Sequence, residues 1–107
     1  MSIINIGATA SLQGWDGVFS FCVAKNALRV LSQSLSRELA PLGIHTSHLI
    51  IDGLLDNERT RKLNPKLPKS RFINLKSAAK SVLYLALQED STCWSFETEV
   101  RPHDENW

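Results

Sequence analysis

Apolar and polar positions follow two different repeats along the chain, and together they predict three strands and two helices. Residues 3–6, 44–51 and 94–101 form short runs rich in β-branched or aromatic side chains, which is typical of strands. Residues 20–40 and 75–88 instead carry apolar side chains three or four positions apart, as amphipathic helices do. Strands that alternate with helices favour a parallel sheet covered by helices. We therefore expect a partial α/β fold with about three parallel strands in the order βαβαβ.

The helix expected between Ser20 and Ala40 has one wide apolar face, broad enough to cover a sheet and to pack against further helices. Pro41 and Gly43 end this helix. The apolar positions at helical spacing are Phe21, Ala24, Leu28, Leu31, Leu35 and Leu39. The polar side, which we expect to face solvent, consists of Lys25, Arg29, Ser32, Ser36 and Arg37.

Length and charge limit the classes of function. A chain of 107 residues forms one domain at most, so we treat residues 1–107 as a single unit. A formal net charge of +1 argues against a nucleic-acid partner. The sequence contains neither an apolar run of membrane-spanning length nor a visible signal peptide. Because Cys22 and Cys93 form no paired motif, we expect buried, reduced thiols in a cytoplasmic protein.

The charges are distributed unevenly along the chain. Acidic residues gather after residue 88, whereas residues 57–71 are basic, with Arg59, Arg61, Lys62, Lys66, Lys69 and Arg71. A phosphate-binding patch is one interpretation of the basic run. We favour a solvent-facing loop, because charge runs usually face solvent and because residues 57–74 also contain Pro65 and Pro68. This loop can include a helical turn.

Two histidines on one strand raise the question of a metal site. His45 and His48 are three positions apart, so their side chains point to opposite faces of a strand and do not converge on one ion. We expect ordinary strand side chains and no metal.

The most specific motif lies at the start of the long helix, where Lys25 follows Phe21 by four positions. With tyrosine at position 21, this would be the Tyr-x-x-x-Lys motif of the short-chain dehydrogenase/reductase family. The chain resembles that family over nearly its whole length, including positions 37–41 and Asp52-Gly53, where the family usually has Pro-Gly. A bacterial subgroup with phenylalanine in the tyrosine position has similar runs at positions 7–10 and at Arg101-Pro102. The resemblance implies the C-terminal half of a Rossmann-like three-layer sandwich.

The resemblance also implies NAD- or NADP-dependent hydride transfer to a carbonyl or from an alcohol. In the family, a tyrosine exchanges a proton with the substrate, a serine holds the substrate oxygen, and a lysine binds the cofactor ribose. The corresponding positions here are Phe21, Ala8 and Lys25. By the same resemblance, the nicotinamide side of a cofactor site would involve Lys25, Gly53, Leu55 and Asn57.

The departures from the family pattern leave this chemistry incomplete. Phe21 cannot exchange a proton, and we expect it to be an ordinary core residue. Thr9 and Ser11 lie near Ala8, but their register favours neither as a substitute hydroxyl. Lys25 is either a ribose contact or a polar residue on the exposed side of its helix. The 107 residues contain no glycine-rich turn of the kind that binds a dinucleotide. The alternative to NAD or NADP is therefore that the chain alone binds no cofactor.

Three hypotheses about function follow. The chain is an oxidoreductase by descent that is inactive alone, or a non-catalytic interaction module, or one half of a split oxidoreductase completed by another protein chain. We expect a dimer through the helix at residues 20–40, because a lone three-stranded sheet leaves apolar surface uncovered.

Overall fold

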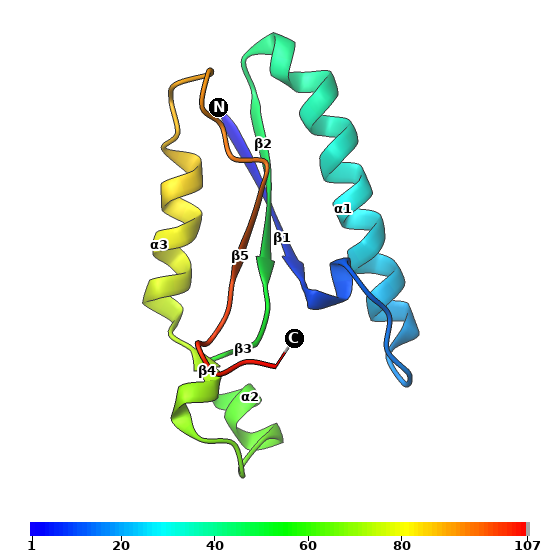
Figure 1. The fold of residues 1–107 in the computed structure, drawn as a ribbon, viewed down its shortest axis with the longest axis vertical. Coiled ribbons are helices and arrows are strands. Elements are labelled where there is room, and N and C mark those ends of the chain that lie inside the picture. The colour runs from blue at the N-terminus through cyan, green and yellow to red at the C-terminus, as the bar shows by residue number, and fades with distance from the viewer. Residues whose placement is uncertain (107) are drawn as a thin grey trace.

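The computed structural model describes residues 1–106, and in it the predicted order of strands and helices is confirmed (Figure 1). Strands β1 (Ser2–Ala8), β2 (His45–Ile51) and β5 (Glu97–Val100) form a parallel sheet in the order β1-β2-β5. Helix α1 (Phe19–Leu39) connects the first two strands, and α3 (Leu75–Ala86) precedes the third. Each of the three predicted strands and both long helices is therefore present.

The helices cover opposite sides of the sheet, which makes three layers. Figure 1 shows α1 on one side of the strands and α3 on the other. Helix α1 packs against β1 and β2, and α3 packs against β1. The largest fully buried apolar side chains come from the central strand and from α3, namely Leu49, Ile50 and Leu85. The core is small because only three strands separate the two helices.

The register of the sheet brings the carboxyl ends of two strands together. Strand β1 pairs with β2 along its whole length, from Ser2 opposite His45 to Ala8 opposite Ile51. Residues that follow Ala8 and Ile51 therefore leave the sheet side by side. In open α/β sheets, ligands bind beyond this edge.

Helix α1 turns a different face to the sheet from the one expected. Ser32 is fully buried, whereas Val30 and Leu31 are 60% and 50% exposed. The Ser32 hydroxyl accepts a hydrogen bond from Asn5 Nδ2 at 2.9 Å and donates one to the Leu28 carbonyl at 2.7 Å. The expectation that Ser32 faces solvent is therefore wrong, because a polar strand side chain opposite the helix gives its hydroxyl a partner.

The segment after β2 has more structure than a loop. Helix α2 (Glu58–Leu63) lies between two short strands, β3 (Leu54–Leu55) and β4 (Phe72–Ile73), which pair in parallel with each other. Three short 3₁₀ turns complete the described elements, at Thr9–Ala10–Ser11, Ala40–Pro41–Leu42 and Lys69–Ser70–Arg71. Strands of two residues carry no readable periodicity, which is why the sequence pattern did not indicate them.

The two cysteines differ in their surroundings. Both are free thiols, as expected, but only Cys22 is buried, and the expectation that Cys93 is buried is wrong. Cys93 lies in the turn before β5, where its backbone N–H donates to the Asp90 carbonyl. No helix within residues 1–106 is both long and apolar enough to cross a membrane.

Candidate functional site

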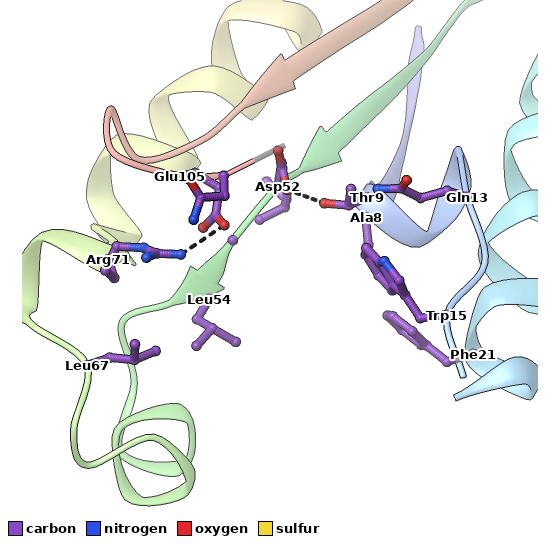
Figure 2. A pocket seen from close by; sticks show the side chains of 13 residues that line it. Ala8, Thr9, Gln13, Trp15, Phe21, Asp52, Leu54, Leu67, Arg71 and Glu105 are labelled. Carbon is purple, nitrogen blue, oxygen red and sulfur yellow. Dashed lines mark hydrogen bonds and ion pairs between the residues drawn. The ribbon is translucent and has the colours of Figure 1, made fainter. Parts of the chain in front are cut away.

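A cavity of about 610 Å³ lies at the carboxyl ends of β1 and β2 (Figure 2). Its volume falls in the range typical of small-molecule sites. The end of β1 contributes Ala8 and Thr9, and the end of β2 contributes Ile51, Asp52 and Gly53. The site therefore follows directly from the pairing of β1 with β2.

A hydrogen bond between side chains joins the ends of the two strands. Thr9 Oγ1 donates to Asp52 Oδ1, and both residues line the cavity (Figure 2). The Asp52 carboxylate is almost fully buried, at 5% exposure, and its backbone N–H donates to the Val100 carbonyl at 2.8 Å. Its other oxygen, Oδ2, lies 3.6 Å from Arg101 Nε and accepts no hydrogen bond from residues 1–106. The buried carboxylate of Asp52 therefore lies at the cavity with a hydrogen bond from Thr9 and an ion pair with Arg101.

One wall of the cavity is aromatic. Trp15, from the loop after Ser11, and Phe21, in the first turn of α1, lie next to each other at this wall (Figure 2). Phe21 is 48% exposed, so the expectation that it is an ordinary core residue is wrong. The helix begins only two residues before Phe21, and the side chain projects past the end of the sheet instead of onto it.

The opposite wall is formed by the segment before β4 and the C-terminal tail. Arg71 donates to Glu105 Oε1 at 3.0 Å and lies 3.8 Å from Asp104 through its Nε atom. Leu54 and Leu67 add apolar surface beside this ion pair (Figure 2). This wall therefore offers a guanidinium group that already has acidic partners.

The two hydroxyls near Ala8 have different roles. Ser11 is 1% exposed, and its hydroxyl accepts a hydrogen bond from the Ala8 backbone N–H at 3.1 Å, away from the cavity lining. Thr9 instead lines the cavity. The register of the sequence favoured neither Thr9 nor Ser11 as a substitute hydroxyl. The structure brings only Thr9 to the cavity.

Lys25 does not line the cavity. Its ammonium group donates to the Ile6 carbonyl at 2.9 Å and lies 5.9 Å from the centre of the Phe21 ring. The residue is half-buried, on a side of α1 that lies near β1. A role in binding a cofactor ribose remains a prediction.

Like Lys25, two of the other three positions expected at the nicotinamide side lie outside the cavity. Gly53 lines the cavity, and a Cβ there would lie 2.9 Å from Pro102 Cδ at a φ of 152°, so glycine is needed for the chain to pass. Leu55 pairs with Ile73 in the small sheet. Asn57 caps α2 by accepting a hydrogen bond from the Thr60 N–H at 2.9 Å. Neither Leu55 nor Asn57 lines the cavity.

The two strand histidines lie on opposite faces, as expected from their spacing. His45 stacks on Trp94 with ring centres 5.0 Å apart, whereas His48 Nδ1 lies 3.2 Å from Glu97 Oε2. Glu97 also accepts a hydrogen bond from Arg29 Nε at 2.7 Å, which lowers the pKa of its carboxyl group, with a smaller contribution from His48. Residues 1–106 contain no cluster of three side chains suited to hold a metal ion.

Half of the basic side chains after β3 form ion pairs. Arg61 pairs with Asp56 through two hydrogen bonds, and Lys62 lies 2.9 Å from Glu58. The Asp56 hydrogen bond raises the pKa of Arg61, and the same bond lowers the pKa of Asp56. With Arg71 bound to Glu105, three of the six basic side chains have acidic partners, which supports the interpretation as a surface segment.

No protein-family model matches the chain, but individual proteins do. The uncharacterised oxidoreductase YjdA of Bacillus subtilis is 34% identical over 92 residues, which covers 81% of this chain and 36% of that protein. The 3-oxoacyl-[acyl-carrier-protein] reductase FabG of Rickettsia bellii is 30% identical over 97 residues, covering 83% and 40%. The chain therefore spans less than half the length of these curated relatives.

Solved structures give the same result for the fold. A short-chain dehydrogenase from Rhodopseudomonas palustris superposes with a TM-score of 0.68 at 35% identity, covering 95% of this chain and 38% of that one. A short-chain oxidoreductase from Pseudomonas aeruginosa, described as having an atypical catalytic centre, superposes with a TM-score of 0.80 over 99% of this chain and 48% of that one. Because the two sequences are only 16% identical, this similarity supports the fold alone. In sequence and in fold, the homologues of this chain are short-chain dehydrogenase/reductase proteins, and the chain corresponds to a part of their Rossmann-like fold.

Proposed function

We propose that residues 1–107 form the substrate-facing part of an NAD(P)-dependent oxidoreductase of the short-chain dehydrogenase/reductase type, and that they do not transfer hydride alone. One observation carries this proposal: Ala8, Phe21 and Gly53 line a single cavity at the carboxyl ends of β1 and β2. These are three of the positions that the family resemblance assigns to the active site. The relatives matched by sequence are named as oxidoreductases and reductases, which supports the reaction class.

The proposed inactivity follows from the side chains at these positions. A phenyl ring and a methyl group cannot donate or accept a proton, so Phe21 and Ala8 supply neither the acid nor the hydroxyl that polarises a substrate. Loss of a general acid typically lowers a rate by about 10²- to 10⁴-fold. Within residues 1–106, Thr9 is the one hydroxyl that the fold places in the cavity near Ala8, and it donates to Asp52.

The described residues do not by themselves suit a dinucleotide. Lys25 uses its ammonium group on the Ile6 carbonyl, and Asn57 uses its side chain to cap α2. Gly53 is the one predicted cofactor position that lines the cavity. A neighbour in fold, the Pseudomonas aeruginosa oxidoreductase, has a structure with NADPH bound, at 18% identity. NAD or NADP is therefore proposed as the cofactor of a completed protein and not of residues 1–107 alone.

A second candidate is a dimerising or interaction module. Its supporting observation is the outer side of α1, where Phe19, Val23, Val30 and Leu31 are each at least half exposed. Strand β1 also lies at the edge of the sheet, where its outer backbone groups can pair with another chain. For an interaction module, we propose a homodimer that forms through α1. For a split oxidoreductase, we propose that a complementary protein chain supplies the rest of the fold. A cytoplasmic location belongs to the proposal because both cysteines are unpaired.

A chimera tests the proposed oxidoreductase. Because the family resemblance implies the C-terminal half of the fold, residues 1–107 are joined to the N-terminal part of the Escherichia coli 3-oxoacyl-[acyl-carrier-protein] reductase. NADPH oxidation is then followed with a ketone substrate. The unchanged chimera is expected to bind NADPH with little turnover. Ala8→Ser with Phe21→Tyr is expected to raise turnover by about 10²- to 10⁴-fold. A chimera that binds no NADPH, or whose turnover the two substitutions leave unchanged, would overturn the proposal.

A further inference from the structure

We propose that residues 103–106, which follow Pro102, form a strap that closes one wall of the cavity at the ends of β1 and β2. The ion pair between Arg71 and Glu105 is the latch that holds this strap in place. The inference goes beyond the proposed function, because it concerns access to the cavity and neither the reaction nor its substrate.

The strap begins at a fixed point. Pro102 is buried beside Gly53, where a Cβ would lie 2.9 Å from Pro102 Cδ. The chain then turns, with the Glu105 N–H donating to the Pro102 carbonyl at 3.1 Å, and runs past the carboxyl end of β2 (Figure 1). Glu105 and Asn106 thereby become part of the cavity lining. The residues after Pro102 can therefore move without a change in the sheet.

Polar side chains, and no backbone hydrogen bonds, join the strap to the other elements of residues 1–106. Ser70 donates to Asp104 Oδ2 at 2.9 Å, and Arg71 Nη2 donates to Glu105 Oε1 at 3.0 Å. Arg71 Nε lies 3.8 Å from Asp104 Oδ1. A segment held by so few contacts opens locally at a much smaller free-energy cost than a strand does. We therefore expect the strap to open while the sheet stays folded.

The latch responds to salt because it is an ion pair that solvent can reach. The side chains of Arg71 and Glu105 are 26% and 17% exposed. At about 0.5 M salt the Debye length is only about 4 Å, so the attraction between two such charges is strongly screened. Arg71 also belongs to the segment that supplies Leu67 to this wall (Figure 2). The pair thus ties a segment before β4 to the tail after β5.

Release of the strap opens only one side of the cavity. It removes Glu105 and Asn106 from the lining, whereas Trp15 and Phe21 stay on the opposite wall. Gly53 lines the cavity at the end of β2, next to the anchor at Pro102. The exposure of the Gly53 amide therefore reports whether the cavity is open.

The test is an NMR measurement on the full chain without cofactor or substrate. Exchange of the Glu105 amide with water reports the strap, and broadening of the Gly53 amide by a neutral gadolinium chelate reports the cavity. Raising NaCl from about 20 mM to about 500 mM is expected to speed the exchange about fivefold, as loss of one strong ion pair allows, and to increase the broadening. If either signal did not respond to salt, the proposal would be overturned.

Arg71→Met removes the guanidinium group from the latch. In low salt this variant is expected to give both signals that the unchanged chain gives in high salt, and added NaCl should change neither. Arg61→Met is the matched control, because Arg61 lies in the same basic segment and pairs with Asp56, and neither of these residues lines the cavity. It is expected to behave like the unchanged chain. Equal signals for Arg71→Met and Arg61→Met would contradict the latch.

Glu105→Gln covers the case in which Arg71→Met does not fold. Glu105 lies in the tail after β5, so the loss of its charge leaves the helices and the sheet intact. This variant is expected to release the strap in low salt about as fully as Arg71→Met does. Signals that match those of the unchanged chain would overturn the proposal. Because neither cofactor nor substrate is present, failure here is distinguishable from failure of the chimera to turn over.

Discussion

Thr9 donates its hydroxyl proton to the buried carboxylate of Asp52, and this bond joins two strand ends that are 43 residues apart in sequence. Both partners lie where the sequence departs from the family pattern. Thr9 follows Ala8, and Asp52 precedes Gly53 in place of proline. The pair gives the cavity a polar centre that neither Phe21 nor Ala8 supplies.

The Thr9–Asp52 bond is expected to stabilise the fold. Thr9→Val keeps the shape of the side chain but leaves Asp52 Oδ1 buried without its donor, which costs roughly 1–3 kcal/mol. The free energy of unfolding, measured by urea denaturation, checks this. Thr92→Val removes the matched exposed bond and is expected to change stability by less than about 0.5 kcal/mol. If both substitutions changed the free energy of unfolding equally, the Thr9–Asp52 bond would not stabilise the fold more than the exposed bond does.

Gly7 is required by the packing of a buried histidine. A Cβ at Gly7 would overlap His48 Nε2 and lie 2.7 Å from Ser11 Oγ. Gly7→Ala is therefore expected to destabilise the protein by about 1–3 kcal/mol, since the strand and the imidazole must move apart. Gly14→Ala is the control, because a Cβ there meets nothing within 4 Å. The expectation fails if thermal unfolding shows the same shift for both.

The ion pair between Arg29 and Glu97 makes stability depend on pH in the acid range. The Arg29 hydrogen bond lowers the pKa of Glu97 in the folded protein below its ordinary value of 4.5. The resulting stability is complete above that ordinary value and is lost as the pH falls through the folded-state pKa. Arg29→Met is expected to flatten this loss between pH 5 and the acid transition, as followed by circular dichroism.

Arg37 provides the control for this experiment. It is exposed on the same helix, and residues 1–106 give it no ion pair. Arg37→Met is therefore expected to keep the wild-type dependence on pH. If Arg29→Met and Arg37→Met gave the same profiles as the unchanged chain, Glu97 would not be the group responsible.

The exposed apolar side of α1 is expected to mediate self-association. Val30 is 60% exposed near the middle of the helix, and Val30→Glu would place a charge in an α1 interface. The unchanged chain is expected to sediment as a dimer and Val30→Glu as a monomer. Leu83→Glu, on the exposed side of α3, should leave the dimer intact. A compact monomer of the unchanged chain in analytical ultracentrifugation would contradict the dimer.

The strands and long helices could be predicted from sequence because their periodicity is local. The orientation of α1 could not, because Ser32 is buried by a hydrogen bond from Asn5, a residue on another element. The apolar face that the pattern predicts includes Leu31, which is 50% exposed. Helical periodicity shows that two faces differ but does not show which partner each face meets.

The residues of the candidate site that follow the family pattern could be predicted from the sequence. Those brought to the site by contacts between distant segments could not. Ala8, Phe21 and Gly53 were assigned by their order in the sequence, and all three line the cavity. Arg71 and Glu105 are brought to the opposite wall by their mutual ion pair across 34 residues of sequence. Asn57 was assigned to the site, but its side chain caps α2, a use that the Asn-x-x-Thr spacing to Thr60 could have indicated.

Residues 1–107 are proposed to form the substrate side of the fold without a dinucleotide site of their own. The most direct test is a calorimetric titration of the purified, folded chain with NADPH, repeated with NADH. No saturable heat is expected at millimolar cofactor, because Lys25 and Asn57 are engaged within the fold and the 107 residues contain no glycine-rich turn. Saturable binding in the micromolar range would contradict it.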